Sequence, residues 1–279
     1  KMTQKASHAS LVKELRERTG IGFMACKKAL TENDNDLDAA IQYLRKISGV
    51  RADGKAGRQT SEGVIGCALD QNAGRGVLLE VNCETDFVAR SDDFLDFVSK
   101  LADHILSEEP DDLPYGGEMS NATLEEMRTQ MVQKLGENIR IGRWRSLVSG
   151  SGCHIGSYLH NNHKIGALVS LVGGTPELGH QIAMHISAEK PRVVAATDLP
   201  QEMIRQESEI YRAQAEESGK PANIVDKMVA GKVKRFTAEI SLLDQDFVCE
   251  SSQTVGQVLT DAGASVSGFI RFELGEQGS

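Results

Sequence analysis

The chain has 279 residues, of which 40% are hydrophobic and 25% charged, and its formal net charge is −9. These proportions predict a soluble globular protein of two or three domains, and no apolar run approaches the roughly 20 residues of a membrane span. A general nucleic-acid binder is normally basic, so the acidic balance argues against that class.

Charge is distributed unevenly along the chain. Residues 1–58 carry 12 Lys or Arg and 7 Asp or Glu, a balance of +5, whereas the remainder is at −14. A basic segment on an acidic body suggests an acidic protein surface as partner. Chance scatter of charges over solvated helix faces is the other interpretation, and charge alone does not choose between the two.

The five cysteines are scattered and form no Cys-x-x-Cys pair. The sequence therefore predicts neither a zinc site nor a disulfide framework. A reducing cytoplasm fits free thiols, and an organelle matrix is the alternative.

Residues 9–48 have the pattern of three short helices. Ser10 is a candidate N-cap for the first helix, which we expect to stop at Gly20. The second is predicted at about 23–30, and Asp36 can cap the third. The third helix has apolar residues at helical spacing, namely Leu37, Ala40, Ile41, Leu44 and Ile47. So small a core predicts a module that is marginal or docked.

Glycines and small or basic residues mark 49–62 as a linker, either flexible or a frayed helix. Beyond it the chain repeats itself, because the pattern of 65–72 recurs at 155–162, a spacing of 90 residues. Each copy reads as two strands joined by a polar turn. The sequence thus predicts an internal duplication with two α+β subdomains, 63–145 and 146–279.

A helix is predicted after each hairpin. The apolar stripes of these two helices are Phe94, Val98, Leu101 and Ile105 in the first copy, and Leu178, Ile182, Ala183 and Ile186 in the second.

Between the copies, 107–121 is expected to be a loop. Thr123 and Glu126 form a candidate capping box for a helix that ends at Gly136. A strand is predicted for 138–148.

The second copy contains an insertion at about 201–236. Two helix patterns, 201–217 and 221–236, are joined by a short turn, which predicts an antiparallel coiled-coil hairpin. Its expected seam is Ile204, Ile210 and Tyr211 against Ile224, Met228, Val229 and Phe236. Afterwards 241–250 and 267–273 are predicted as strands that complete the second sheet, with a short helix at 254–261.

Catalytic motifs are absent from the sequence. It contains no GxxxxGK[ST], GxGxxG or HExxH pattern. His180 and His185 lie five apart, on different faces of one helix, so a metal pair there is not expected. We therefore expect no enzymatic activity, no cofactor and no metal, although catalytic groups can assemble from distant residues.

The stretch 80–90, EVNCETDFVAR, leads from an apolar strand into a turn where Asp86 and Phe87 are adjacent, ahead of a helix near Ser91. Side chains of such a turn are free to contact a partner. The alternative is that Phe87 folds back into the core and Asp86 caps a helix.

This stretch and ELRERTG–GFMACKKAL, residues 14–30, together resemble the two signature stretches of the elongation factor Ts family. The resemblance continues through residues 134–139, 156–160, 254–257 and 268–273. It implies a ubiquitin-associated-like fold for the three-helix module. It also identifies the inserted hairpin with the family's coiled coil, whose presence favours a bacterial-like, cytoplasmic form.

The resemblance implies a translation elongation factor that acts in protein biosynthesis as a guanine-nucleotide exchange factor. Its partner would be elongation factor Tu, in GDP-bound and nucleotide-free states, with no direct contact to nucleic acid or membrane. The factor would promote GDP release and be displaced when GTP binds.

The implied partner-binding residues fall into two groups. Phe87 would act as an apolar wedge near the partner's nucleotide site, displacing groups around Mg²⁺ and the phosphates, with Thr85, Asp86 and Val88 beside it. The other matched contact positions are Arg16, Phe23, Met24 and His160. The small module needs at most one of Phe23 and Met24 in its core, which leaves an exposed apolar candidate. For His160 the alternative is a hydrogen-bonded residue of a hairpin turn.

Two other classes stay open. One is a non-catalytic adaptor or scaffold that binds another acidic or ubiquitin-like protein through the three-helix module. The other is a small-molecule enzyme, which would need a bound cofactor or metal.

Overall fold

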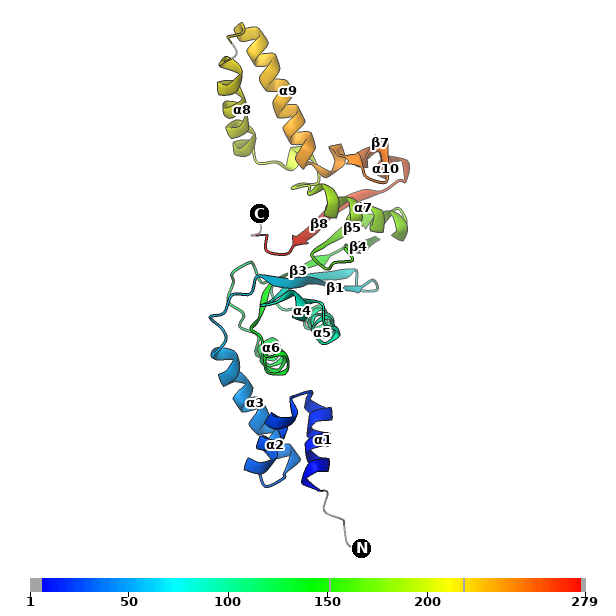
Figure 1. Cartoon of the computed structure of the whole chain (residues 1–279). Coiled ribbons are helices and arrows are strands. Elements are labelled where there is room, and N and C mark those ends of the chain that lie inside the picture. Colours follow the sequence, from blue (N-terminus) through cyan, green and yellow to red (C-terminus); the bar gives the residue numbers. More distant parts are fainter. Residues whose placement is uncertain (1–6, 151, 218, 277–279) are drawn as a thin grey trace. The chain divides into compact units, whose positions relative to one another are not determined.

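A computed structural model describes residues 7–150, 152–217 and 219–276 (Figure 1). The predicted α+β class is confirmed, with three N-terminal helices followed by antiparallel sheets and helices. Within the described residues the chain divides into two compact units, one made of 7–66, 79–144 and 274–276 and the other of 67–78 and the described part of 145–273. In the described part of the chain, no helix is long and apolar enough to cross a membrane.

Three helices form the N-terminal module: α1 (His8–Thr19), α2 (Phe23–Glu32) and α3 (Leu37–Asp53). Their buried core is Val12, Leu15, Ile21, Cys26, Ala29, Leu30, Ala40 and Leu44, with Leu37, Ile41 and Ile47 packed against it. The predicted stop at Gly20 is present as a left-handed residue with φ of 67°.

The predicted cap of the first helix is wrong. The N-cap is Ser7, whose hydroxyl accepts the backbone N–H of Ser10, because the helix begins earlier than the apolar pattern indicates. The third helix has the expected cap, with the Asp36 carboxylate accepting from Ala39 N at 2.9 Å.

Helix α3 also continues to Asp53, into the stretch expected as a linker, and packs against α6 (Ala122–Leu135). Arg45 and Glu126 pair at 3.2 Å between these helices, and the Ser48 hydroxyl donates to the Gln133 side chain.

The first sheet has the order β1-β2-β3, formed by β1 (Glu62–Asp70), β2 (Arg75–Cys83) and β3 (Ile139–Val148). Helix α5 (Asp92–Glu108) follows the hairpin, and all four predicted stripe residues are buried. The carboxylate of Glu80 on β2 pairs with Arg143 on β3 at 2.9 Å, with both side chains buried. Burying two opposite charges together avoids the cost of an unpaired buried ion.

The second sheet repeats this arrangement as β4-β5-β8, with β4 (Cys153–Leu159), β5 (Ile165–Val172) and β8 (Ser265–Glu273) all antiparallel. Helix α7 (Pro176–Glu189) follows the hairpin and buries its predicted stripe against the sheet. In both sheets a hairpin is completed by a third strand beside its second strand, as expected of a duplicated unit.

The helix before β3 also begins differently from the prediction. Asn121 is the N-cap, and its side-chain oxygen accepts from Thr123 N at 3.0 Å and Leu124 N at 3.1 Å. The capping box of Thr123 and Glu126 is therefore wrong, because Asn121 occupies the cap position two residues earlier. The predicted end at Gly136 is correct, with φ of 80°.

The strand expected at 241–250 is mostly wrong. The chain there forms a 3₁₀ turn, η2 (Leu242–Asp244), and a short separate sheet of β6 (Asp246–Phe247) and β7 (Glu250–Thr254), before α10 (Val255–Asp261). The backbone N–H groups of Leu242 and Leu243 bond to the carbonyls of Val193 and Val194. Because the loop satisfies these donors, they do not join a sheet ladder.

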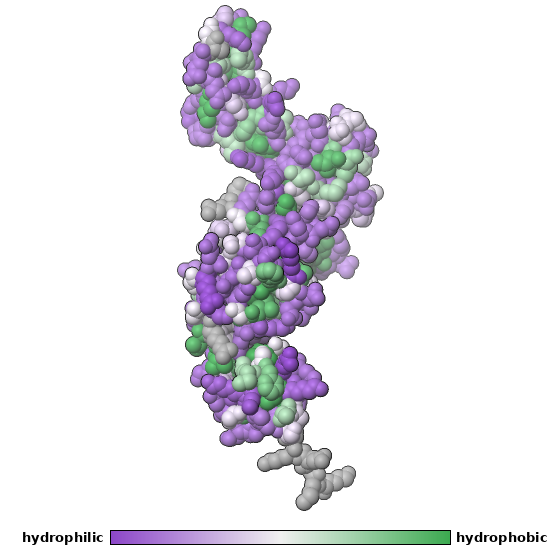
Figure 2. Space-filling view, in the orientation of Figure 1, coloured by the Kyte–Doolittle hydropathy of each residue, from purple (hydrophilic) through white to green (hydrophobic). Residues whose placement is uncertain are grey.

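The inserted hairpin consists of α8 (Gln201–Glu216) and α9 (Ala222–Ile240), which lie side by side in Figure 1. The predicted seam is partly wrong, because Ile210 and Ile224 are exposed. The buried seam is Ala215, Val225 and Val229, with Tyr211, Met228 and Val233 packed against it. Figure 2 shows mainly hydrophilic residues on the visible face of these two helices, with small apolar areas between them.

His185 on α7 is fully buried and has polar partners on both ring nitrogens. Nε2 lies 3.0 Å from the Gln245 side-chain oxygen, and Nδ1 accepts the backbone N–H of Val248 at 3.3 Å. This pattern requires the neutral ring, since a proton on Nδ1 would face another donor. Desolvation by burial lowers the pKa of His185, while the bond to Gln245 and the charge of Glu189 oppose that shift.

We expect the free energy of unfolding to decrease as the pH falls below about 6.5, the ordinary pKa of histidine. The unfolded chain then takes up a proton that the native His185 binds less readily, so the native state loses its advantage. Urea unfolding of the wild type and a His185→Phe variant at several pH values between 5 and 8 tests this. The variant should show a smaller pH slope, and an equal slope in both proteins would contradict the assignment.

Candidate functional site

Residues 84–91 connect β2 to α5 through one helical turn, α4 (Asp86–Ala89). Thr85 is the N-cap, and its hydroxyl accepts from Val88 N at 3.3 Å. Asp86 therefore does not cap the helix. It lies in the first turn, and its carboxylate pairs with Arg90 at 3.1 Å on the surface.

Phe87 points outward from this turn. Its exposed fraction is 84%, the highest among the large hydrophobic residues of the described chain, while Ala89 is buried and Val88 is half-buried. The alternative in which Phe87 belongs to the core is therefore wrong. A phenylalanine side chain left in water forgoes about 1.5–3 kcal/mol of burial free energy. Exposure of a large apolar side chain at this cost is typical of a binding site.

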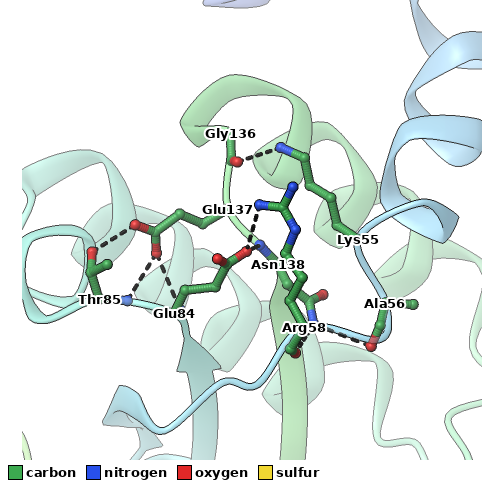
Figure 3. A network of polar contacts seen from close by, with 8 residues as sticks. All are labelled: Lys55, Ala56, Arg58, Glu84, Thr85, Gly136, Glu137 and Asn138. Carbon is green, nitrogen blue, oxygen red and sulfur yellow. Dashed lines mark hydrogen bonds and ion pairs between the residues drawn. The ribbon is translucent and has the colours of Figure 1, made fainter.

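The base of the turn is held by residues distant in sequence (Figure 3). The Glu137 carboxylate accepts three hydrogen bonds, from Glu84 N and Thr85 N at 3.1 Å each and from the Thr85 hydroxyl at 2.6 Å. In return the Glu84 carboxylate accepts the N–H of Asn138 at 2.6 Å and pairs with Arg58 at 3.4 Å. The turn is thus connected to the loop between α6 and β3.

The second copy of the duplicated unit has no separate one-turn helix here, because Thr175, the counterpart of Thr85 at the spacing of 90 residues, caps α7 itself through Leu178 N. There β5 passes into α7 through residues 173–175 alone, whereas residues 84–91 separate β2 from α5. Phe87 thus lies in a helical turn that is separate from the following helix only in the first copy.

Arg16, Phe23 and Met24 all belong to the three-helix module. Phe23 and Met24 are the first residues of α2, with exposed fractions of 52% and 72%, and Arg16 is exposed near the end of α1. We expected at least one of the two apolar residues to be exposed, and both are. Leu30 and Cys26, further along α2, supply its core contacts instead.

His160 is exposed in the turn between β4 and β5, in the other compact unit. Its Nδ1 lies 2.9 Å from the Asn162 side-chain oxygen, and its ring meets that of Tyr158 edge-on at 6.3 Å between centroids. His160 is therefore a hydrogen-bonded residue of the hairpin turn, as the alternative predicted, and its imidazole ring is also exposed.

Sequence reasoning assigned no role to Glu137. Its signals were its place in the stretch 134–139 that resembles the family and its position directly after the helix-ending Gly136. As for metals, within residues 7–150, 152–217 and 219–276 no three His, Cys, Asp or Glu side chains are grouped to hold an ion.

The comparison with known proteins gives a consistent result. A family model described as "Elongation factor TS" matches residues 84–276. The chain is 47% identical over 270 residues to a protein named elongation factor Ts from Thioalkalivibrio sulfidiphilus, covering 96% of this chain and 92% of that protein. It is 48% identical over 271 residues to one of the same name from Methylococcus capsulatus, with 96% and 92% covered.

Proposed function

The chain belongs to the elongation factor Ts family, and from that premise we propose that it is a guanine-nucleotide exchange factor for elongation factor Tu. As a member of the family it is a translation elongation factor and serves protein biosynthesis. In the proposed reaction it binds the GDP-bound partner, promotes release of GDP, holds the nucleotide-free form and leaves when GTP binds.

The observation that carries the proposal is the outward position of Phe87 on a turn whose base is fixed. An aromatic ring held in this way can insert between apolar elements of a partner without first losing much conformational freedom. Inserted near the nucleotide site, the ring of Phe87 would displace groups that hold Mg²⁺ and the phosphates. Mg²⁺ demands near-ideal octahedral geometry, so a small displacement weakens its hold.

The remaining contacts would supply affinity. Phe23 and Met24 offer an exposed apolar pair, with Arg16 on the same module, and His160 offers a second contact on the other unit. The net charge of +5 over residues 1–58 favours an acidic surface on the partner. Since translation occurs in the cytoplasm of bacteria, we propose that location for the chain.

Exchange follows from linkage and requires no covalent chemistry by this chain. A factor that binds the nucleotide-free partner more tightly than the GDP-bound partner must weaken GDP binding by the same ratio. A coupling of about 5 kcal/mol corresponds to a several-thousandfold change. The difference in affinity for the two states of the partner is enough to release GDP, so no catalytic groups are needed. We therefore propose that the chain is not an enzyme, because it makes and breaks no covalent bonds.

The experiment that tests the proposal uses elongation factor Tu loaded with a fluorescent GDP. The chain is titrated into it in the presence of excess unlabelled GDP, and loss of the fluorescent nucleotide is followed with time. The release rate should rise with added chain and reach a plateau. Binding without faster release would favour an adaptor, and a rate unaffected by the chain would overturn the proposal.

A further inference from the structure

We propose that Glu137 is the residue that positions Phe87 for exchange, acting through the backbone of Glu84 and Thr85. This inference rests on the proposed function, because the turn it holds is the one that would enter the partner. It concerns a residue that contacts neither the partner's nucleotide nor the Phe87 ring.

The first support is the number and direction of the hydrogen bonds. One Glu137 oxygen accepts the consecutive N–H groups of Glu84 and Thr85, both at 3.1 Å, and the other accepts the Thr85 hydroxyl at 2.6 Å. Hydrogen bonds to an ionised acceptor are stronger than those between neutral groups. Both oxygens of one carboxylate thus fix the residue that caps the Phe87 turn.

The second support is that Glu137 itself has little freedom. It follows Gly136, whose left-handed conformation ends α6 with the Gly136 N–H bonded to Val132 O at 3.0 Å. The next residue, Asn138, is buried and donates to the carbonyl oxygens of Ala56 at 3.3 Å and Arg58 at 2.9 Å. Lys55 adds a bond to the Gly136 carbonyl (Figure 3).

The third support is the reciprocal bond between the two segments. While Glu137 accepts from the backbone of Glu84, the Glu84 carboxylate accepts from Asn138 N at 2.6 Å. Each segment therefore satisfies a backbone donor of the other. The Arg58 guanidinium, 3.4 Å from Glu84, offsets part of the repulsion between the two carboxylates.

The short helix α4 cannot fix the direction of Phe87 alone. It spans only Asp86–Ala89, and a single helical turn is unstable without outside contacts. Phe87 follows the Glu137-bound residue Thr85 by two positions, so loss of the Glu137 bonds frees the ring to take several orientations. Because a small misplacement of a functional group can greatly lower a reaction rate, we expect a mobile Phe87 ring to stimulate GDP release less.

The test compares Glu137→Ala and Glu137→Gln in the full-length chain. Glutamine keeps one oxygen for the two backbone donors, and its amide can donate to the Thr85 hydroxyl, so it should largely restore function. Glu137→Ala should lower the maximal stimulated rate of GDP release about tenfold or more. Affinity for nucleotide-free elongation factor Tu should change little, because the other contact residues are untouched.

A matched control is Asn121→Ala, which removes the cap at the opposite end of α6. It destabilises the same helix without contacting the turn, so its maximal release rate should equal that of the wild type. Amide hydrogen exchange gives a readout independent of the partner. The amides of Glu84 and Thr85 should exchange faster in Glu137→Ala than in Asn121→Ala.

A double variant separates positioning from general stability. If Glu137 acts through Phe87, then Glu137→Ala should add no further loss of rate in a Phe87→Ala background. Additive losses, or a Glu137→Ala rate equal to wild type while Phe87→Ala is slow, would overturn this inference alone. A Phe87→Ala rate equal to wild type would instead contradict the wedge role of Phe87 on which this inference rests, whereas a release rate unaffected by the wild-type chain would overturn the proposed function itself.

Discussion

Replacing Phe87 by alanine is expected to lower the maximal stimulated rate of GDP release from elongation factor Tu by roughly 30-fold, because truncating an aromatic hot spot costs about 2 kcal/mol or more. The ring has an exposed fraction of 84% in the free chain, so its removal takes away almost no burial within the protein. Thermal stability should therefore stay the same.

The measurement is the fluorescent-GDP release assay at saturating concentrations of each variant. Phe87→Leu keeps part of the apolar volume and should retain an intermediate rate. Val148→Ala is the matched control, because Val148 is also apolar and exposed, at 60%, but lies on β3 away from the turn. An unchanged rate for Phe87→Ala would rule out the wedge mechanism.

A second large effect is expected at the crossing of β4 and α7. A methyl group at Gly156 would lie 2.3 Å from both the carbonyl carbon and the oxygen of Gly179. These atoms belong to the backbone of a helix, so neither rotates away as a side-chain tip can. We expect Gly156→Ala to lower the free energy of unfolding by about 3 kcal/mol or more, at the upper end for overpacking.

The free energy of unfolding of each variant is measured by urea unfolding, followed through the helical circular dichroism signal. Two other glycine variants provide controls. Gly268→Ala on β8 has open space around the new methyl group and should change stability by less than about 0.5 kcal/mol. Gly66 is the equivalent of Gly156 in the first copy. Its added methyl group meets side-chain carbons of Val98 and Leu79, which can move, so Gly66→Ala should cost less. Equal losses in Gly66→Ala and Gly156→Ala would contradict this explanation.

The two copies of the duplicated unit are alike in their sheets and differ in one connection. Both hairpins keep the same strand order and a helix over the sheet, yet they differ in what joins the second strand to the helix. The first copy carries the turn with Phe87, and the second passes almost directly into α7. The duplicated framework thus keeps its strand order and its covering helix while the segment that joins them differs between the copies.

The predictions that the structure contradicts concern positions where the sequence offers more than one residue of suitable chemistry. Thr123 and Glu126 have the spacing of a capping box, but Asn121 caps the helix two residues earlier. The apolar Ile210 and Ile224 suggested a seam, yet α8 and α9 pack through Ala215 and Val225. In each case the local pattern alone does not choose between the candidate residues.

The sequence by itself determined the α+β class, the two repeated strand hairpins, the stops at Gly20 and Gly136, and the stripe that buries α5. These features depend on periodicity and on local backbone preferences, which neighbouring residues express without help from the rest of the chain. Only the tertiary structure decided that Phe87 faces solvent and that Glu137 holds its turn. Residues 85 and 137 are far apart in sequence, and the free energy that fixes a one-turn helix comes from such long-range contacts rather than from its own few residues.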